Sequence, residues 1–264
     1  MRARYLDTPH GQVHARTAGR AGPWLVLHHE SPLSSSVFDA ALPHLGAWCR
    51  AVALDTPGYG QSDPPDGPLA LPAYATRLLA AARIATGGEP FAVAGVHTGA
   101  SIAVEVARQG GDAVTAVTLM GLPAYDERTR AQRLATWAPP RTPDAGGDHL
   151  RWAWERYTEI WPDATPDLRH RAVVDLLGVL GRYHWAYEAA FRHDPLPALA
   201  ALRQPVQFIA AGGDPLTPAD ERAAAATGAR IDHLPDLPGQ IAARAPRELS
   251  RLLRDFLTPL TPGR

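Results

Sequence analysis

The sequence predicts an α/β fold built around a mostly parallel β-sheet. Two observations support this: short apolar runs alternate with amphipathic stretches of helical periodicity, and the alternation continues along most of the 264 residues. Such alternation is typical of helices that connect parallel strands and pack on a sheet. The length suffices for one large α/β domain with an insertion, or for two small domains.

In residues 1–122 the predicted strands and helices follow one another closely. Strands are expected at residues 2–8, 11–17, 24–29, 50–56, 91–96 and 113–122. Helices are expected at residues 37–48, 72–88 and 101–111. Residues 57–68 are rich in Gly and Pro and are expected to form a loop.

A long helical segment then interrupts the alternation and carries five of the seven tryptophans. The alternation resumes afterwards with strands expected at 205–211 and 229–235 and helices within 213–227 and 246–257. We interpret this as an α/β core of residues 1–123 and 197–264 with a helical cap of residues 124–196. Open α/β sheets bind ligands at the carboxyl ends of their strands. The cap is therefore expected over that edge, with Trp154 and Trp185 among the substrate-binding residues.

Composition narrows the range of functions. The formal net charge is −1 and no basic run occurs, so the sequence has no electrostatic signature of nucleic-acid binding. All basic residues are arginines, which excludes lysine Schiff-base chemistry. Cys49 is the single cysteine, which excludes an internal disulfide. Since neither a signal-peptide core nor a membrane-spanning apolar run is visible, we expect a cytoplasmic protein that does not bind membranes.

Four motifs occur in register along the chain. They are His-Glu-Ser-Pro at 29–32, Asp-Thr-Pro-Gly-Tyr-Gly-Gln-Ser-Asp at 55–63, Gly-Val-His-Thr-Gly at 95–99 and Ala-Gly-Gly-Asp at 211–214. In this order they resemble the oxyanion loop, the D-x-x-G-x-G-x-S segment, the nucleophile elbow and the acid loop of the α/β-hydrolase-fold superfamily. The resemblance covers nearly the whole chain. It implies a mostly parallel eight-stranded sheet with a helical cap insertion.

The catalytic triad of that family is not preserved. His97 stands where the nucleophilic serine, aspartate or cysteine belongs. Gln240 or Gly239 stands where the base histidine belongs, and His233 lies six residues too early, in the preceding predicted strand. Only Asp214 remains of the three. A serine hydrolase built on these positions would lack both nucleophile and base.

His97 is the strongest candidate for a catalytic residue. A nucleophile elbow exposes one side chain at the top of the sheet, and the following helix points free N–H groups and a positive dipole end toward it. This environment disfavours an imidazolium, so we expect His97 to be mostly neutral near pH 7 and to act as a general base. The alternative is that His97 only fills the position in a protein that has lost its chemistry.

The neighbouring positions complete the candidate site. The resemblance implies that the backbone N–H groups of Ser31 and Thr98 form an oxyanion hole. Glu30, where the family has glycine, is a candidate acid or base, or else a partner of loop backbone. We expect Gln240 to contact substrate. Asp214 is expected either to act in the site beside Gln240 or only to cap a helix.

His29 is the remaining candidate for substrate contact, and it also raises the question of a metal. Consecutive side chains at a strand end point to alternate faces, so residues 28–30 do not converge on one ion. His29, His97 and Asp214 form a conceivable two-histidine, one-carboxylate set. The resemblance argues against it, since the loop histidine of the family usually braces backbone. We expect no metal and no cofactor.

Three functions remain open. The first is non-hydrolytic chemistry next to a carbonyl, of the epimerase, isomerase, cyclase or lyase type, with His97 as base; atypical members of the fold favour this and a role in secondary metabolism. The second is hydrolysis of esters or lactones by histidine-activated water or by His97 as nucleophile. The third is ligand binding without catalysis. The aromatic cap favours a small-molecule or peptide substrate of apolar or aromatic character, and either a monomer or a homodimer is compatible with the family.

Overall fold

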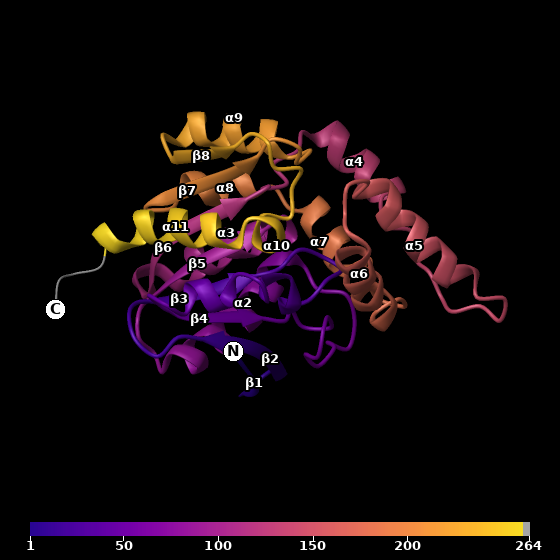
Figure 1. Cartoon of the computed structure of the whole chain (residues 1–264), viewed down its shortest axis with the longest axis horizontal. Helices are drawn as coiled ribbons and strands as arrows, with labels where there is room; N and C mark the ends of the chain where they lie inside the picture. Colours follow the sequence, from indigo (N-terminus) through magenta and orange to yellow (C-terminus); the bar gives the residue numbers. More distant parts are fainter. Residues whose placement is uncertain (261–264) are drawn as a thin grey trace.

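An eight-stranded sheet forms the centre of the protein in the computed structural model, which describes residues 1–260 (Figure 1). The strands are β1 (Arg2–Thr8), β2 (Gly11–Ala18), β3 (Trp24–His28), β4 (Arg50–Leu54), β5 (Phe91–Val96), β6 (Val114–Met120), β7 (Val206–Ala211) and β8 (Arg230–Leu234). Their order is β1-β2-β4-β3-β5-β6-β7-β8. Strands β1 and β2 pair antiparallel, as do β2 and β4, and all other pairs are parallel. The predicted mostly parallel sheet is confirmed.

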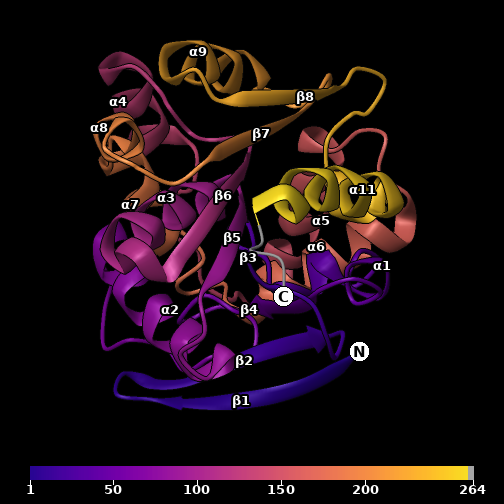
Figure 2. The same cartoon turned by 90° about the vertical axis from the view of Figure 1, so that its left-hand side faces the viewer.

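Helices cover both faces of this sheet (Figure 2). The core helices are α1 (Leu42–Leu45), α2 (Leu71–Thr86), α3 (Thr98–Gly110), α8 (Pro195–Ala200), α9 (Thr217–Thr227), α10 (Ile241–Arg244) and α11 (Pro246–Leu257). In β3, Val26 belongs to the apolar cluster with α2 and α3, while Leu25 and Leu27 belong to the cluster with α1 and α11. Because successive strand residues point to opposite faces, both layers are apolar, and the central strands read as continuous hydrophobic runs.

The prediction of one continuous helix at residues 37–48 is wrong. The structure has a short 3-10 helix, η1 (Ser35–Phe38), followed by the separate helix α1. Pro43 stands in the first turn of α1, where the missing N–H of proline costs nothing. Two further 3-10 turns, η2 (Gly111–Ala113) and η3 (Thr258–Leu260), follow α3 and α11.

Five helices lie between β6 and β7 in the sequence, and the first four of them lie together at one end of the sheet (Figure 1). These four are α4 (Glu127–Thr136), α5 (Asp148–Ile160), α6 (Pro166–Gly178) and α7 (Trp185–Arg192), called the inserted helices below. The boundary expected between residues 196 and 197 falls inside α8. This helix begins at Pro195 because Asp194 accepts a hydrogen bond from the N–H of Leu196, at 3.1 Å.

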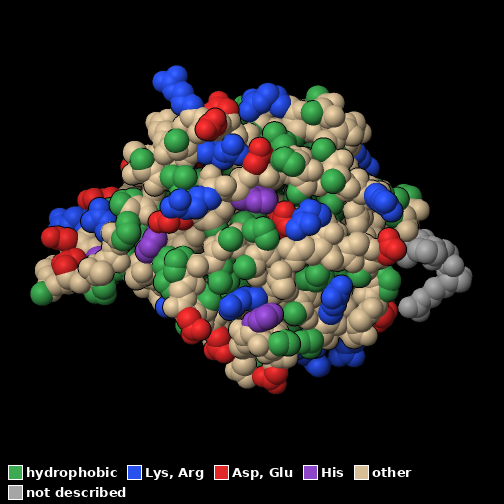
Figure 3. All heavy atoms as spheres, turned by 180° about the vertical axis from the view of Figure 1, so that it is seen from behind, with side chains coloured by type: hydrophobic (Ala, Val, Ile, Leu, Met, Phe, Trp, Pro, Cys, Tyr) green, Lys and Arg blue, Asp and Glu red, His purple; other side chains and the backbone are tan. Residues whose placement is uncertain are grey.

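The surface carries both charge signs. Figure 3 shows acidic and basic side chains interspersed among apolar ones over the face it displays, in keeping with the net charge of −1. Among residues 1–260, none of the helices combines the length and the apolar character needed to cross a bilayer.

Candidate active site

The elbow between β5 and α3 holds His97 in a strained backbone conformation, with φ 48° and ψ −113°. Its flanking glycines are sterically required: a Cβ on Gly95 would overlap the carbonyl oxygen of Gly99, and a Cβ on Gly99 would overlap that of His28. The N–H of His97 donates to the carbonyl of Met120 at 2.9 Å, which ties the turn to the neighbouring strand. The tight turn therefore directs the imidazole outward at the carboxyl end of the sheet.

The imidazole of His97 contacts Asp214 directly. Its Nε2 lies 2.7 Å from Oδ2 of Asp214, which follows β7. The other carboxylate oxygen of Asp214 accepts a hydrogen bond from the N–H of Leu216 at 2.9 Å. The His97 side chain is 31% exposed and that of Asp214 12% exposed. One face of the histidine therefore remains open to a ligand while the carboxylate fixes its orientation.

Gly121, directly after β6, makes room for this pair. A Cβ at Gly121 would overlap Cδ2 of His97 and lie 2.7 Å from Nε2. The residue also has φ +68°, a conformation that favours glycine. Any side chain here would displace the imidazole from Asp214.

The expectation that His97 is mostly neutral near pH 7 is wrong. Burial lowers its pKa, but the charge and hydrogen bond of Asp214, with smaller contributions from Glu30 and Asp220, together raise it to about 9. For Asp214, burial raises the pKa, and the adjacent His97 more than offsets this and lowers it. The pair is therefore an imidazolium and a carboxylate at neutral pH. A short-range ionic contact outweighs the helix dipole on which the expectation relied.

Glu30 borders the same cavity as His97. Its side chain is buried, and Oε2 has no hydrogen-bond partner among residues 1–260. Burial raises the pKa of this carboxyl, while the charge of His97 lowers it in part. A buried carboxyl oxygen without a partner is costly unless it serves a ligand or carries a proton.

His29 does not contact the cavity, so its expected role in substrate binding is wrong. Its Nε2 accepts a hydrogen bond from the N–H of Thr56 at 2.9 Å, and Nδ1 lies 2.8 Å from the carbonyl oxygen of Glu30. Both ring nitrogens are used to brace two loops, and the residue is buried. His29 instead positions the backbone that carries Glu30.

The cavity above these residues encloses about 860 Å³ of free space when its opening to solvent is included. Six of the predicted site residues border it, namely Glu30, Ser31, His97, Thr98, Asp214 and Gln240. Thr98 is the first residue of α3, so its N–H has no partner within the helix. Gln240 has φ 49°, and its Oε1 accepts a hydrogen bond from Nε of Arg244 at 2.9 Å.

The position of the missing base is not filled by another histidine. His233 lies on β8 with a 47% exposed side chain, 3.8 Å from Glu221. It does not border the cavity. The elbow histidine itself therefore takes the carboxylate that the base would otherwise hold.

Two predicted substrate-binding tryptophans lie elsewhere. Trp154 is 41% exposed on α5, with the guanidinium of Arg169 over its ring. The inward face of α5 is instead marked by Ala153 and Tyr157, which are buried four residues apart. Trp185 borders a separate surface hollow formed with residues 68–72. Counting aromatic residues could not tell the inner from the outer face of these helices.

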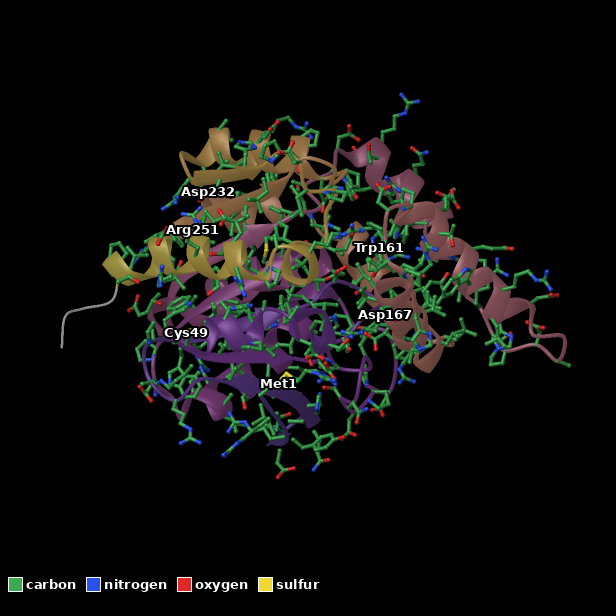
Figure 4. The ribbon with its side chains drawn as sticks, in the orientation of Figure 1. Met1, Cys49, Trp161, Asp167, Asp232 and Arg251 are labelled. Atoms are coloured by element: carbon green, nitrogen blue, oxygen red, sulfur yellow. The ribbon has the colours of Figure 1, made fainter. Side chains whose placement is uncertain are left out.

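Several cavity residues were not among the predicted site residues. The inserted helices and adjoining loops contribute Tyr125, Arg133, Trp137, Tyr157, Trp161, Tyr187 and Phe191. Trp161, labelled in Figure 4, lies where these helices meet the core. The four-residue spacing from Ala153 through Tyr157 to Trp161 is the signal that could have identified it.

Asp220 on α9 is a second residue that sequence reasoning missed. It is buried and accepts hydrogen bonds from the N–H groups of Gly121 and Leu122, at 2.8 and 2.7 Å. Burial raises its pKa to about 7, against the lowering effect of these two bonds. Asp220 holds the turn against which the His97 ring lies.

Comparison with known proteins gives the same architecture. Residues 23–144 match the family model described as alpha/beta hydrolase fold. The enol-lactonase from Burkholderia xenovorans LB400 has a TM-score of 0.75 at 22% identity over 97% of this chain and 100% of that one. Epoxide Hydrolase A from Mycobacterium thermoresistibile has a TM-score of 0.77 at 22% identity, over 97% and 98% of the two chains.

A curated relative matches this chain by sequence over a short region. A haloalkane dehalogenase of Mesorhizobium japonicum is 41% identical over 49 residues, which is 19% of this chain and only 16% of that protein. The strand order, the elbow geometry and these matches agree. The chain has the α/β-hydrolase fold, and part of it, residues 23–144, matches the model of that family, with a histidine at the tip of the turn between β5 and α3.

Proposed function

We propose that this protein is an enzyme that moves a proton at a carbon next to a carbonyl group, with His97 as the proton-transferring residue. The observation that carries the proposal is the 2.7 Å contact between Nε2 of His97 and Asp214 at the edge of an apolar cavity. An imidazole fixed in this way presents its other nitrogen, Nδ1, for proton transfer.

Residues of the cavity account for the proton and the electron pair that move in the proposed step. Neutral His97 takes the proton from the carbon through Nδ1 and becomes an imidazolium, which Asp214 stabilises. The electron pair moves onto the carbonyl oxygen, and the N–H groups of Ser31 and Thr98 hold the resulting charge. Delivery of a proton to the opposite face of the same carbon gives epimerisation, and delivery to another atom gives isomerisation. Because the pKa of His97 is about 9, the reactive neutral form increases as the pH approaches that value.

Glu30 provides a second proton carrier in the same cavity. Its raised pKa makes the protonated form more accessible near neutral pH than for an ordinary glutamate. Two titratable groups with displaced pKa values in one cavity are typical of acid–base catalysis. We assign to Glu30 the return of the proton, or its removal from the opposite face of the substrate.

Solvent deuterium exchange tests this proposal without a known product. A panel of ketones, β-keto esters, lactones and short peptides is incubated with the enzyme in D₂O, and deuterium at the α-carbon is measured by NMR. The wild type is expected to catalyse exchange with at least one compound, and His97→Gln is expected to slow it by about 100-fold or more. His233→Gln is the matched control. Equal exchange rates for His97→Gln and the wild type would exclude the mechanism.

Hydrolysis is the second candidate, favoured by the names of the similar structures, which include an enol-lactonase, an epoxide hydrolase and the E-2-(Acetamidomethylene)succinate Hydrolase. The same imidazole would activate water, or its nitrogen would be acylated and then released by water. Uptake of ¹⁸O from labelled water into product, or an acyl adduct on the elbow peptide, distinguishes these routes from proton transfer. Ligand binding without turnover in either assay would identify a binding protein instead.

A further inference from the structure

Four aromatic side chains, here called the aromatic collar, form a chain of contacts along the cavity wall: Tyr125, Trp137, Tyr187 and Phe191. The ring of Trp137 lies 6.4 Å from that of Tyr187, which stacks on Phe191 at 5.9 Å. Phe191 in turn lies 6.1 Å from Tyr125. These rings come from α7 and from residues on both sides of α4.

Arg133 of α4 closes this chain into a ring of contacts. Its guanidinium carbon lies 4.3 Å from the ring centre of Trp137 and 5.8 Å from that of Tyr125. Arg133 borders the same cavity as the collar and as His97. A guanidinium stacked on two rings is held in place, and the N–H groups around its edge remain available for a ligand.

No acidic side chain neutralises Arg133 within residues 1–260. Its guanidinium makes neither an ion pair nor a hydrogen bond there, whereas Arg130, one turn earlier on the same helix, pairs with Asp194 at 3.3 Å. The other charges of the cavity are already satisfied in part, because Asp214 pairs with His97. Burial favours the neutral form of Glu30. Arg133 is thus the positive charge of the cavity that has no counter-ion.

We infer that Arg133 and the aromatic collar bind a substrate that carries a carboxylate on a flat apolar or aromatic group, whose reacting carbon then lies toward His97. The planar guanidinium matches a carboxylate in two parallel hydrogen bonds, and the collar covers the apolar part. This inference rests on the proposed function, since it takes the cavity at His97 as the place of the reaction.

The test compares two ligands of nearly equal size, 4-phenylbutyrate and its neutral amide, 4-phenylbutanamide, by titration calorimetry on the full chain. The wild type is expected to bind the acid about 10-fold or more tightly than the amide. Arg133→Gln is expected to lose this preference, and Arg133→Lys to retain part of it. Arg128→Gln, on an exposed position of the same helix, is the matched control and should behave as the wild type.

The inference is overturned if 4-phenylbutyrate binds the wild type no better than the amide does, or does not bind at all. An Arg133→Gln variant that keeps the preference also overturns it. If that variant does not fold, Arg133→Lys and the salt dependence of wild-type binding decide, because only the acid should bind more weakly at high salt. His97→Gln should slow deuterium exchange by about 100-fold or more and leave the preference for the acid intact. The two proposals therefore fail separately.

Discussion

The imidazole of His97 is bonded directly to the carboxylate of Asp214, with 2.7 Å between Nε2 and Oδ2 and no third residue between them. In a serine triad the acid orients a histidine, which in turn activates the nucleophile. Here the residue at the nucleophile position takes the place of that histidine. The elbow and the loop after β7 bring these two side chains into direct contact.

Replacement of the acid should lower the pKa of His97. In Asp214→Asn the carboxylate charge is lost while the burial of the imidazole remains, so the titration midpoint of His97 should fall from about 9 to its ordinary value or below. The midpoint can be followed by NMR through the ring C–H signals. His233→Gln assigns the signal of the exposed histidine and should not move that of His97. An unchanged midpoint in Asp214→Asn would show that the pair does not form.

The same pair should make stability depend on pH. The folded-state pKa of His97 is raised above its ordinary 6.5, so the folded chain binds the proton more tightly than the unfolded chain. The resulting stabilisation is complete below about pH 6.5 and is lost as the pH rises through about 9. Urea unfolding at pH 6, 7.5 and 9 should show this decline in the wild type and a flatter profile in Asp214→Asn. If the stability of the two proteins changed with pH in the same way, the pair of His97 and Asp214 would not be the cause of the decline.

The elements that place His97 and Asp214 could be predicted from the sequence because both follow long apolar strands. The runs that become β5 and β7 are recognisable by composition, and the glycines around His97 mark the turn. Parallel strands end at one edge of the sheet, so the elbow and the acid loop had to lie near one another.

The charge of His97 could not be predicted in this way. It depends on whether the ring reaches Asp214, and that depends on the absence of a side chain at Gly121, a residue with no distinctive sequence context. Aromatic content alone does not identify the buried face of the inserted helices: Trp154 and Tyr157 are three residues apart, yet one is exposed and the other buried. The four-residue spacing of Ala153 and Tyr157 marks the buried face of α5, whereas the number of aromatic residues does not.

A methyl group at Gly121 should break the pair. In Gly121→Ala the new Cβ overlaps the His97 ring, in addition to the strain of φ +68°. We expect a loss of stability of about 2–4 kcal/mol from overpacking and backbone strain combined, and activity reduced to the level of His97→Gln. Gly87→Ala is the matched control, since it has φ +65° and open space around the new Cβ. In thermal unfolding, Gly87→Ala should lose only the stability that corresponds to the backbone strain, and its activity should be unchanged.

Asparagine at Asp220 should destabilise the turn beside His97. Asp220 accepts two backbone N–H groups with its two oxygens, and an amide offers only one acceptor, so one of the donors of Gly121 or Leu122 would face an NH₂ group. The unmet N–H group costs about 1–3 kcal/mol. Because burial raises the pKa of Asp220 to about 7, removal of its charge offsets part of this cost in urea unfolding at pH 8. Asp236→Asn, at an exposed position, controls for the removal of charge. If Asp220→Asn and Asp236→Asn were equally stable, Asp220 would not be needed to hold the turn beside His97.

Glu30→Gln should separate stability from function. The folded-state pKa of Glu30 is raised above its ordinary 4.5, so its contribution to stability is largest below that pH and declines as the carboxyl ionises. Glutamine removes this penalty, and thermal unfolding at pH 8 should therefore occur at or above the wild-type temperature.

The loss of this negative charge should also lower the pKa of His97, because Glu30 contributes to raising it. NMR titration of His97 in Glu30→Gln should show the shift, with a smaller size than in Asp214→Asn. Deuterium exchange should slow if Glu30 carries a proton. Glu159→Gln, on the exposed face of α5, should change none of these quantities. A Glu30→Gln variant that unfolds earlier yet exchanges at the wild-type rate would make Glu30 a structural residue, and His97 would then be the only proton carrier of the cavity.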